Sequence, residues 1–259
     1  MDLATVGGLA LASAAMLISA IMEGGSLLAL IKPSAAVLVI GGTLGATMIC
    51  YGLSDFLSLP ALIGRAFSPP KHDPEATVKL LVELAELARK EGLLALDKRV
   101  KDIPDPLTQK GIRLAVDGST PELVESMLET EIALLQAKYK TQAKIFAAAG
   151  GFAPTMGIIG TVMGLVHVLG NLAEPDKLGE AIATAFIATL YGITTANLFW
   201  LPIGNKLKHI AEQEILVKQL TLEGILSIQR GDNPRIVEEK LRVFLEENGP
   251  AGKSEGKAA

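Results

Sequence analysis

Four long stretches without Asp, Glu, Lys or Arg dominate the hydrophobic pattern of the chain. They cover residues 3–22, 33–54, 145–173 and 181–205. Each has about 20 residues or more, the length at which a helix crosses a hydrocarbon core roughly 30 Å thick. The pattern therefore predicts four transmembrane helices, of which the third is long enough to project beyond a bilayer.

The more polar regions repeat their apolar residues with the spacing of helices. Within residues 75–90, Leu81, Leu84 and Ala88 fall on one face, as in an amphipathic helix. A shorter helix is predicted at 235–245, directly after an Asn-Pro pair that favours a helix start.

Another helix is predicted to follow Thr120, whose side chain suits an N-cap, with Pro121 at the first helical position. The proline-rich residues 102–106 predict a loop before it. The apolar stripe expected on this helix consists of Val124, Met127, Leu128, Ile132 and Leu135.

No segment sustains the alternation of apolar and polar residues that a strand shows. The predicted fold class is therefore all-α, a polytopic membrane protein with four transmembrane helices and a helical cytoplasmic domain. We expect four parts: transmembrane helices 1 and 2 (1–54), the cytoplasmic domain (55–142), transmembrane helices 3 and 4 (143–205), and a helical cytoplasmic tail (206–259). The end of the tail, 247–259, is expected to be disordered.

Basic residues are distributed unevenly along the chain. Of the 24 Lys and Arg residues, 22 lie in 55–144 or after residue 205, and the loops 23–32 and 174–180 hold one each. Basic residues concentrate on the cytoplasmic side of membrane proteins, so both long polar regions and both termini are expected in the cytoplasm. The net charge of −4 gives no sign of nucleic-acid binding.

The ionisable residues limit the chemistry that the chain performs. There is no nucleophile beside a base, no metal-spaced His or Cys cluster and no phosphate loop, so an enzyme or a cofactor is not expected. His72, His167 and His209 are isolated in sequence. At membrane depth His167 is the one ionisable candidate, either neutral and hydrogen-bonded or involved in ion handling. If the chain conducts ions, we expect a partner to supply the acid.

Small residues are frequent in all four apolar stretches. GGTLG (41–45) and GTVMG (160–164) both fit the GxxxG pattern, which lets helices approach closely in lipid. Interior glycine weakens a helix in water, but in lipid the backbone must stay hydrogen-bonded, so helix is retained. We expect a tightly packed and oligomeric bundle.

Two prolines and two threonines stand at related depths in the third and fourth stretches. Pro154 and Pro202 each remove a backbone donor and are either tolerated kinks or hinges. Thr161 and Thr189 fall at comparable depths in antiparallel neighbours. Their hydroxyls either bond back to their own helices or face one path and coordinate a hard cation, which prefers oxygen ligands.

The same region resembles a known family. APTMGIIGTVMGLVHVLGNL and LGEAIATAFIATLYGITTANLFWLPIGNKL resemble the paired third and fourth transmembrane helices of the MotA/PomA flagellar stator subunits. ARKEGLLALDKRV (88–100) resembles the cytoplasmic charged motif of that family. The topology agrees over nearly the whole chain.

This resemblance implies an ion-driven, torque-generating stator subunit in the bacterial cytoplasmic (inner) membrane. It implies a homopentameric ring around a MotB/PomB-type partner, which binds peptidoglycan and supplies an essential Asp. Ion flow turns the ring in this family, and the cytoplasmic domain drives the rotor through charge contacts with the switch protein FliG.

The resemblance also carries roles to single residues. Arg89 and Lys90 resemble the family's basic rotor contacts, and Asp97 stands where the family usually has Glu. Lys98 departs from the pattern, because some sodium-type members have a second acid there. The rotor charge pattern expected from the family is therefore not fully matched.

Within the transmembrane helices, Pro154 and Pro202 resemble the family's prolines that couple ion passage to cytoplasmic motion. Thr161 and Thr189 resemble hydroxyls of the sodium path in sodium-driven members, whereas proton-driven members usually have Ala at the first position. Ala188 departs from the paired threonines of some sodium types. We expect transported Na⁺ rather than H⁺, held transiently by the two threonines.

Three other readings stay open from the sequence. An ExbB/TolQ-type proton-driven motor subunit would energise outer-membrane processes, but that type usually has three spans. A channel or transporter acting alone is disfavoured because no charge lies at membrane depth. A passive scaffold would make Pro154 and Thr161 matter for stability only.

Overall fold

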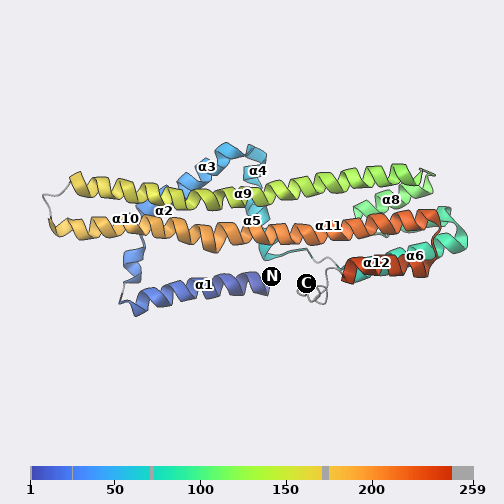
Figure 1. Ribbon diagram of the computed structural model, residues 1–259, viewed down its shortest axis with the longest axis horizontal. Helices are drawn as coiled ribbons and strands as arrows, with labels where there is room; N and C mark the ends of the chain where they lie inside the picture. Colours follow the sequence, from blue (N-terminus) through green and yellow to red (C-terminus); the bar gives the residue numbers. More distant parts are fainter. Residues whose placement is uncertain (1, 25, 71–72, 171–174, 247–259) are drawn as a thin grey trace, which may run out of the picture. The chain divides into compact units, whose positions relative to one another are not determined.

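The computed structural model describes residues 2–24, 26–70, 73–170 and 175–246, and every regular element in these ranges is a helix. The all-α prediction is therefore confirmed. The predicted disorder of 247–259 concerns residues outside the described ranges. Elements are labelled as in Figure 1. They are α1 (Leu3–Met22), η1 (Leu27–Leu30), α2 (Pro33–Ala36), η2 (Val37–Gly41), α3 (Gly42–Cys50), α4 (Leu53–Leu57), α5 (Leu59–Phe67), α6 (Pro74–Glu91), η3 (Leu93–Leu96), α7 (Asp97–Val100), α8 (Pro106–Val116), α9 (Pro121–Gly170), α10 (Pro175–Thr195), η4 (Ala196–Trp200), α11 (Leu201–Arg230) and α12 (Pro234–Glu246).

Four helical stretches of the described residues are long and apolar enough to cross a membrane. They are Leu3–Met22, Leu27–Cys50, Pro121–Gly170 and Leu178–Arg230. Each overlaps one predicted transmembrane segment, although the predictions 33–54 and 145–173 extend past the ends of the second and third stretches. The last two stretches are far longer than a bilayer requires. Both continue from an apolar segment into an amphipathic one, and the predicted projection of the third helix is thereby confirmed.

The chain folds into two compact units. Unit 1 comprises Met1–Pro70 and Tyr139–Ile210, and unit 2 comprises Lys71–Lys138 and Ala211–Ala259. The expected division into four segments has different boundaries, because residues 55–70, 139–142 and 206–210 all belong to unit 1. The largest difference is at residues 55–70. Residues 55–70, assigned from sequence to the cytoplasmic domain, pack with the apolar segments of unit 1.

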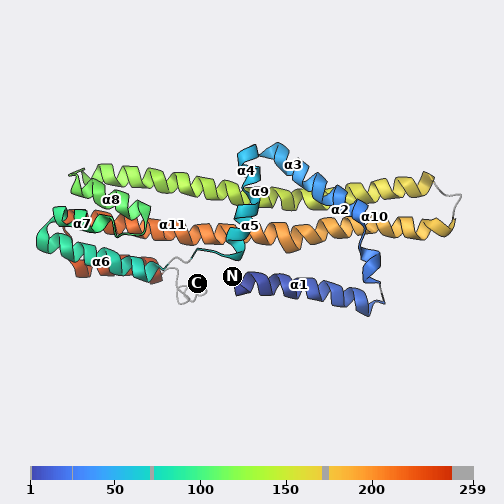
Figure 2. The ribbon, with the colours of Figure 1, turned by 180° about the vertical axis from the view of Figure 1, so that it is seen from behind.

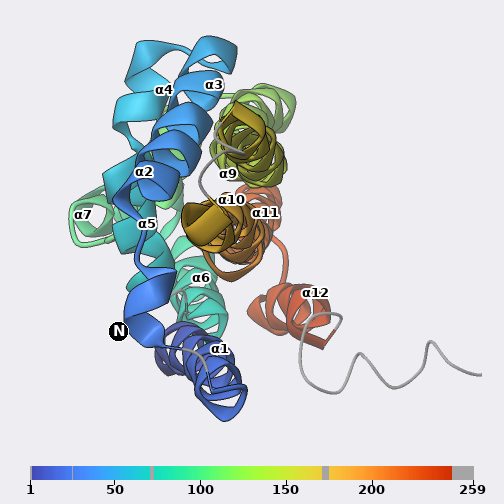
Figure 3. The ribbon, with the colours of Figure 1, turned by 90° about the vertical axis from the view of Figure 1, so that its left-hand side faces the viewer.

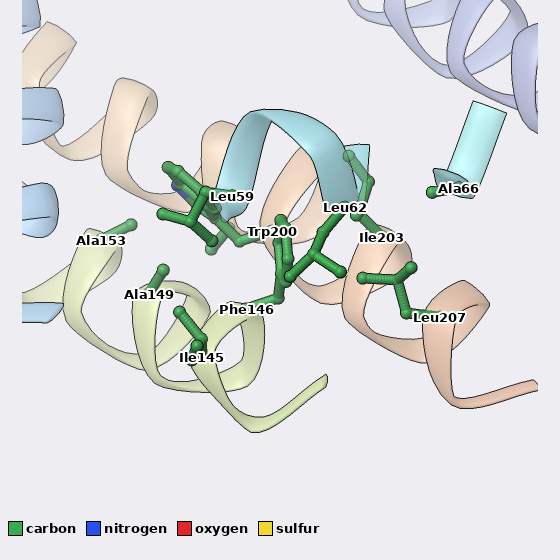
Figure 4. Close-up of a cluster of buried hydrophobic side chains, with 11 residues drawn as sticks. Leu59, Leu62, Ala66, Ile145, Phe146, Ala149, Ala153, Trp200, Ile203 and Leu207 are labelled. Carbon is green, nitrogen blue, oxygen red and sulfur yellow. The ribbon is translucent and has the colours of Figure 1, made fainter. Parts of the chain in front are cut away.

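The core of unit 1 explains that difference. Figure 4 shows side chains of α5 meeting side chains of α9 and of the η4–α11 segment. At its centre, the rings of Phe146 and Trp200 lie 6.1 Å apart between centroids. The unit 1 core consists of Leu59, Leu62, Ala66, Ile145, Phe146, Ala149, Ala153, Ala196, Trp200, Ile203 and Leu207.

Glycines bring α9 and α10 into backbone contact along one line. The two helices run side by side in Figure 1. A Cβ on Gly192 would lie 2.5 Å from the carbonyl oxygen of Ala153 and 3.1 Å from the Cα of Gly157. A Cβ on Gly164 would lie 2.6 Å from the Cβ of Ala185. The predicted close packing through the GTVMG motif is confirmed between these two helices.

The GGTLG motif behaves differently. A Cβ on Gly41 or Gly45 would meet nothing within 4 Å, whereas one on Gly42 would lie 2.7 Å from the sulfur of Met156. The α2–η2–α3 span lies against α9 and α10, as Figure 3 shows end-on. Within this chain the close approach therefore uses a glycine between the two motif positions. The packing expected from the GxxxG motif of this helix in an oligomeric bundle stays a prediction.

Unit 2 is built from amphipathic helices with well-formed ends. Asp73 caps α6 by accepting from the N–H of Ala76 at 3.0 Å, and α6 ends at Gly92, whose φ of +85° favours glycine. Leu81 and Leu84 are buried as predicted, whereas Ala88 is only half-buried. Figure 2 shows α12, the predicted C-terminal helix, alongside α6.

The amphipathic stripe at the start of α9 is narrower than predicted. Val124, Leu128 and Ile132 are buried, but Met127 is exposed and Leu135 is half-buried. Thr120 caps the helix as expected. The buried residues follow an i, i+4 line, and residues off that line fall at its edges.

The loop predicted at 102–106 is confirmed except at Pro106, which begins α8. Ile103 in this loop is buried, and Asp105 caps α8 and pairs with Lys218 of α11. Burial raises the pKa of Asp105, but hydrogen bonds from Lys218 and Thr108 outweigh it and hold the pKa below its ordinary value. A charged side chain thus fixes α8 to α11.

The glycine contact yields a stability prediction. Gly192→Ala adds a Cβ that meets backbone atoms, which cannot move aside by changing rotamer, so we expect a loss of about 1–3 kcal/mol in the free energy of unfolding. The measurement is thermal unfolding of the purified protein in detergent. Gly151→Ala is the matched control, because its Cβ would meet nothing within 4 Å. A Gly192 variant as stable as the control would contradict the packing argument.

Candidate functional site

Thr161 of α9 and Thr189 of α10, predicted to share a depth, are in direct contact. Their two hydroxyl oxygens are hydrogen-bonded to each other, and both side chains are half-buried. Thr161 is also within hydrogen-bonding distance of the carbonyls of Gly157 at 3.2 Å and Ala185 at 3.0 Å. The Thr189 hydroxyl is 3.3 Å from the same Gly157 carbonyl.

These contacts combine the two expected behaviours of the hydroxyls. Thr161 bonds back to its own helix through Gly157, and it also reaches across to α10. Thr189 reaches across to α9. The result is a cluster of four oxygens, two hydroxyl and two carbonyl, which we call the threonine cluster. Oxygens of this kind are ligands for hard cations.

The glycine contact makes the threonine cluster possible. Gly157 contributes a carbonyl to the cluster, and a Cβ on it would lie 2.9 Å from the Ala188 carbonyl oxygen and 3.0 Å from the Thr189 Cα. A side chain at position 157 would push the helices apart and separate the hydroxyls. Ala188, noted as a departure from some sodium types, is the small residue that faces Gly160.

Pro154 lies inside α9, which continues through it as one helix. The proline ring has no N–H for the carbonyl of Gly150, one turn earlier. Its Cα would be 3.1 Å from a Cβ placed on Gly192, so the proline faces the tightest part of the glycine contact. The backbone hydrogen bond that the proline removes is therefore missing next to the contact between α9 and α10.

Pro202 follows an unusual helical segment. The five residues of η4, Ala196–Trp200, form a π-helix, and Pro202 is the second residue of α11. A wider π-turn relieves the clash between a proline ring and the carbonyl four residues earlier. The sequence predicted a kink here, and the structure shows that the helix accommodates the proline by a local change of hydrogen-bond register.

Charged residues predicted to contact the rotor lie on one exposed segment of unit 2. Arg89 and Lys90 are exposed on the last turn of α6, and Lys90 pairs with Glu86 at 3.3 Å. Asp97 is exposed at the start of α7. The buried Leu96 anchors η3, which separates the two sets of charges.

Sequence reasoning missed a cavity in unit 1 that has four polar residues in a mainly apolar lining. The cavity has a volume of about 520 Å³ and lies between α2, α9 and α10. Its polar lining residues are Ser34, His167, Glu180 and Thr184, and its other lining residues are apolar or glycine. His167, isolated in the sequence, is thus brought near a carboxylate and two hydroxyls that line the same space. Glu180 also pairs with Lys32 at 3.0 Å.

Tyr191 is a second residue that the sequence reasoning missed. Its hydroxyl donates to the carbonyl of Leu30 at 2.6 Å and accepts from the N–H of Lys32 at 3.2 Å. It therefore fixes the loop before α2 to α10, two residues from Thr189. A tyrosine within an apolar stretch signals such a contact, because a buried phenol requires a hydrogen-bond partner.

Among the described residues, no group of three or more His, Cys, Asp or Glu side chains is arranged to hold a metal ion. The oxygens of the threonine cluster are neutral, so they suit a transient cation rather than a tightly held one. The site thus differs from a resident metal centre.

Comparison with known proteins agrees with this architecture. Residues 99–219 match the model of the MotA/TolQ/ExbB proton channel family, and residues 6–92 match the model of the motility protein A N-terminal region. The fold and these matches define a membrane subunit of the MotA/TolQ/ExbB class.

Curated relatives narrow that class. The chain is 35% identical to motility protein A of Bacillus subtilis, over 95% of this chain and 91% of the relative. It is 36% identical to the chemotaxis protein PomA of Vibrio alginolyticus over 95% of this chain. The solved C. jejuni MotAB structure matches with a TM-score of 0.92 and 30% identity, covering 97% and 98% of the two chains. The flagellar MotAB stator complex from Bacillus subtilis matches with a TM-score of 0.85 and 34% identity, covering 92% and 94%.

The chain therefore belongs to the MotA/PomA family of flagellar motor stator subunits. This family consists of motor subunits and not of enzymes. The resemblance drawn from the third and fourth apolar stretches and from the charged motif is confirmed.

Proposed function

We propose that this stator subunit generates torque from an inward flow of ions, with Na⁺ favoured over H⁺. The observation that supports this most directly is the threonine cluster, in which Thr161 and Thr189 direct two hydroxyls and two carbonyls to one place between α9 and α10. A hydroxyl at position 161 supplies an oxygen that an alanine would lack. Partial burial lets an ion exchange at the cluster.

An acidic partner completes the proposal. None of the four apolar stretches of the sequence carries Asp, Glu, Lys or Arg. A carboxylate at membrane depth must therefore come from a second chain of the MotB/PomB type, which is the kind of chain present in the solved MotAB complexes. That partner would also anchor the complex to peptidoglycan.

The remaining parts of the proposal concern assembly. We place several copies of the chain, as a pentamer, around the partner in the cytoplasmic membrane, with both termini in the cytoplasm. The charge distribution supports this orientation. The exposed charges at Arg89, Lys90 and Asp97 are proposed to contact the rotor protein FliG.

The energy available is sufficient for such a motion. One monovalent ion crossing the membrane releases about 2.3 kcal/mol per 100 mV, in addition to its concentration term. Pro154 and Pro202 directly neighbour the core residues Ala153 and Ile203 in sequence. We propose that they convert ion passage near the threonine cluster into motion of α9 and α11.

An ExbB/TolQ-type role is the second candidate, because the family model matched by residues 99–219 includes those proteins. The separate match of residues 6–92 to the motility protein A N-terminal model favours the flagellar role. The first experiment below distinguishes the two.

We expect this chain, expressed with its cognate partner, to restore rotation in a flagellated cell that lacks stators. Rotation speed is measured while sodium is varied at fixed pH and membrane potential. A speed that rises with sodium supports the motor and its ion together. A speed indifferent to sodium but lost when the proton gradient collapses would retain the motor and exclude sodium. No rotation, with the complex present in the membrane beside a compatible rotor, would favour the ExbB/TolQ-type role.

We expect Thr161→Ala to reduce sodium-dependent rotation while the complex still assembles. Loss of one hydroxyl removes an ion ligand and costs a hydrogen bond worth about 1 kcal/mol, so the sodium concentration for half-maximal speed should rise roughly fivefold. Thr161→Ser is the control, since it keeps the hydroxyl. An unchanged sodium dependence in the alanine variant would rule out coordination by Thr161.

We expect Arg89→Glu to lower torque without altering membrane levels. An exposed charge contact contributes up to about 1 kcal/mol, so a roughly fivefold weaker rotor contact is expected, with partial recovery when a rotor charge is reversed. Arg235→Glu, at an exposed residue of α12, is the matched control. Full torque in the Arg89 variant would remove this residue from the contact.

A further inference from the structure

Helix α1 is attached to the rest of unit 1 without burying any of its own side chains. None of its residues is buried, and its apolar side chains are exposed along its length. A contact farther along the helix is weak, because the Met16 sulfur that accepts from the Thr194 hydroxyl at 3.6 Å is a poor acceptor. The strongest polar contacts that attach α1 to its neighbours lie at its first turn.

Asp2 makes these contacts with three elements. Its N–H donates to the carbonyl of Phe67 at the end of α5, at 2.8 Å. Its carboxylate caps α1 by accepting from the N–H of Thr5 at 3.2 Å, and it pairs with the ammonium group of Lys206 of α11 at 2.8 Å. We call this set the α1 latch: Asp2, Thr5, the Phe67 carbonyl and Lys206.

Electrostatic attraction favours the Asp2–Lys206 ion pair at neutral pH. Hydrogen bonds from Lys206 and Thr5 lower the pKa of Asp2 to about 2, so its carboxylate is charged. The two paired side chains are 26% and 22% exposed, so water only partly screens the pair. Asp2 thus serves both as the N-cap of α1 and as the anion of the pair.

The latch lies next to Pro202. Lys206 is four residues after this proline, so it occupies the next turn of the same helix face. Between the latch and the proline is a cavity of about 350 Å³. Gly8 and Leu9 of α1 line one side, and Phe199 and Pro202 line the other.

The cavity is open at Gly8, where an added Cβ would meet nothing within 4 Å. The turn that contains Pro202 therefore borders free volume on the side of α1. It follows η4, whose π-turns lack the regular hydrogen-bond register of an α-helix. A segment with fewer stabilising contacts and adjacent space moves more readily than its neighbours.

We propose that the Asp2–Lys206 pair couples α1 to a local movement of the Pro202 turn, by holding the first turn of α1 to α11 across the cavity that Pro202 lines. The proposal rests on the proposed coupling role of Pro202. Because α1 buries no side chain, it follows a displacement of Lys206 with little loss of packing. Asp2 and Lys206 act as positioning residues and do not contact the ion.

Charge variants of the pair test the latch in the complete stator complex, in cells. Asp2→Ser keeps a good N-cap but removes the charge, and Lys206→Gln removes the cation. We expect each to lower torque per stator unit roughly two- to fivefold, as expected for a partly exposed ion pair. The double variant should be no worse than either single variant, and Lys206→Arg should retain torque. Glu23→Gln, at the exposed far end of α1, is the control.

A second test fills the cavity. Gly8→Leu places a side chain into the space beside Pro202 and should lower torque while leaving the amount of complex unchanged. Gly7→Leu is the matched control, because its Cβ also meets nothing within 4 Å but it does not line the cavity. Equal effects of the two variants would remove the cavity from the proposal.

The readouts separate coupling from stability. Torque per unit is obtained from stepwise speed changes as single stators join the rotor, and complex levels are measured in the same membranes. Reduced levels with normal torque per unit would mean that the latch is merely structural. Wild-type torque in both Asp2→Ser and Lys206→Gln would overturn the proposal, as would fully additive losses in the double variant.

A different measurement tests the latch if the proposed function fails. If the wild-type chain with its partner turns no rotor, hydrogen exchange of the purified complex in lipid nanodiscs tests the latch instead. The amides of residues 6–9 should exchange at least about twofold faster in Asp2→Ser and Lys206→Gln than in wild type or Lys206→Arg. Unchanged exchange in these variants would exclude the latch independently of rotation.

Discussion

Backbone-to-backbone contact between α9 and α10 is the constraint on which the candidate site depends. Gly157 and Gly192 face each other where a Cβ on either would meet main-chain atoms of the other helix. Hydrophobic burial provides no force between helices in lipid, so close packing and cross-helix hydrogen bonds must hold them together. The hydroxyls of Thr161 and Thr189 provide those bonds at the same level. The close packing of the two helices and the threonine cluster therefore stabilise each other, and both require the glycines.

Much of this could be predicted from the sequence, because its causes are local. The length of the stretches without charged residues defines the four apolar spans, and the helical spacing of apolar residues locates Leu81 and Leu84 on a buried face. The pairing of Thr161 with Thr189 followed from their depths in adjacent helices. These inferences needed no knowledge of which side chains meet across distant parts of the chain.

Other features depend on tertiary contacts and were beyond the sequence pattern. Residues 55–70 contain few charges and short helices, and the burial of Leu59, Leu62 and Ala66 in the unit 1 core assigns them to unit 1. Met127 fits a helical stripe but has no neighbour to cover it. The glycines at 41 and 45 fit a packing motif, but a Cβ on either would meet no atom of this chain within 4 Å, because the pattern specifies small size and not what lies opposite. The π-helix before Pro202 likewise reflects how a proline is accommodated.

The distribution of stabilising contacts limits where unit 1 can deform. The glycines from Gly157 to Gly164 hold α9 and α10 in close contact along one line, so a shift at this contact requires separation of the helices. The opposite conditions hold at η4 and the first turn of α11, where the hydrogen-bond register changes and a cavity adjoins Pro202. A force applied at the threonine cluster would therefore displace α9 and α10 together, and the chain would bend at η4. In the proposed motor, this arrangement keeps the ion ligands in register while the helix beyond them moves.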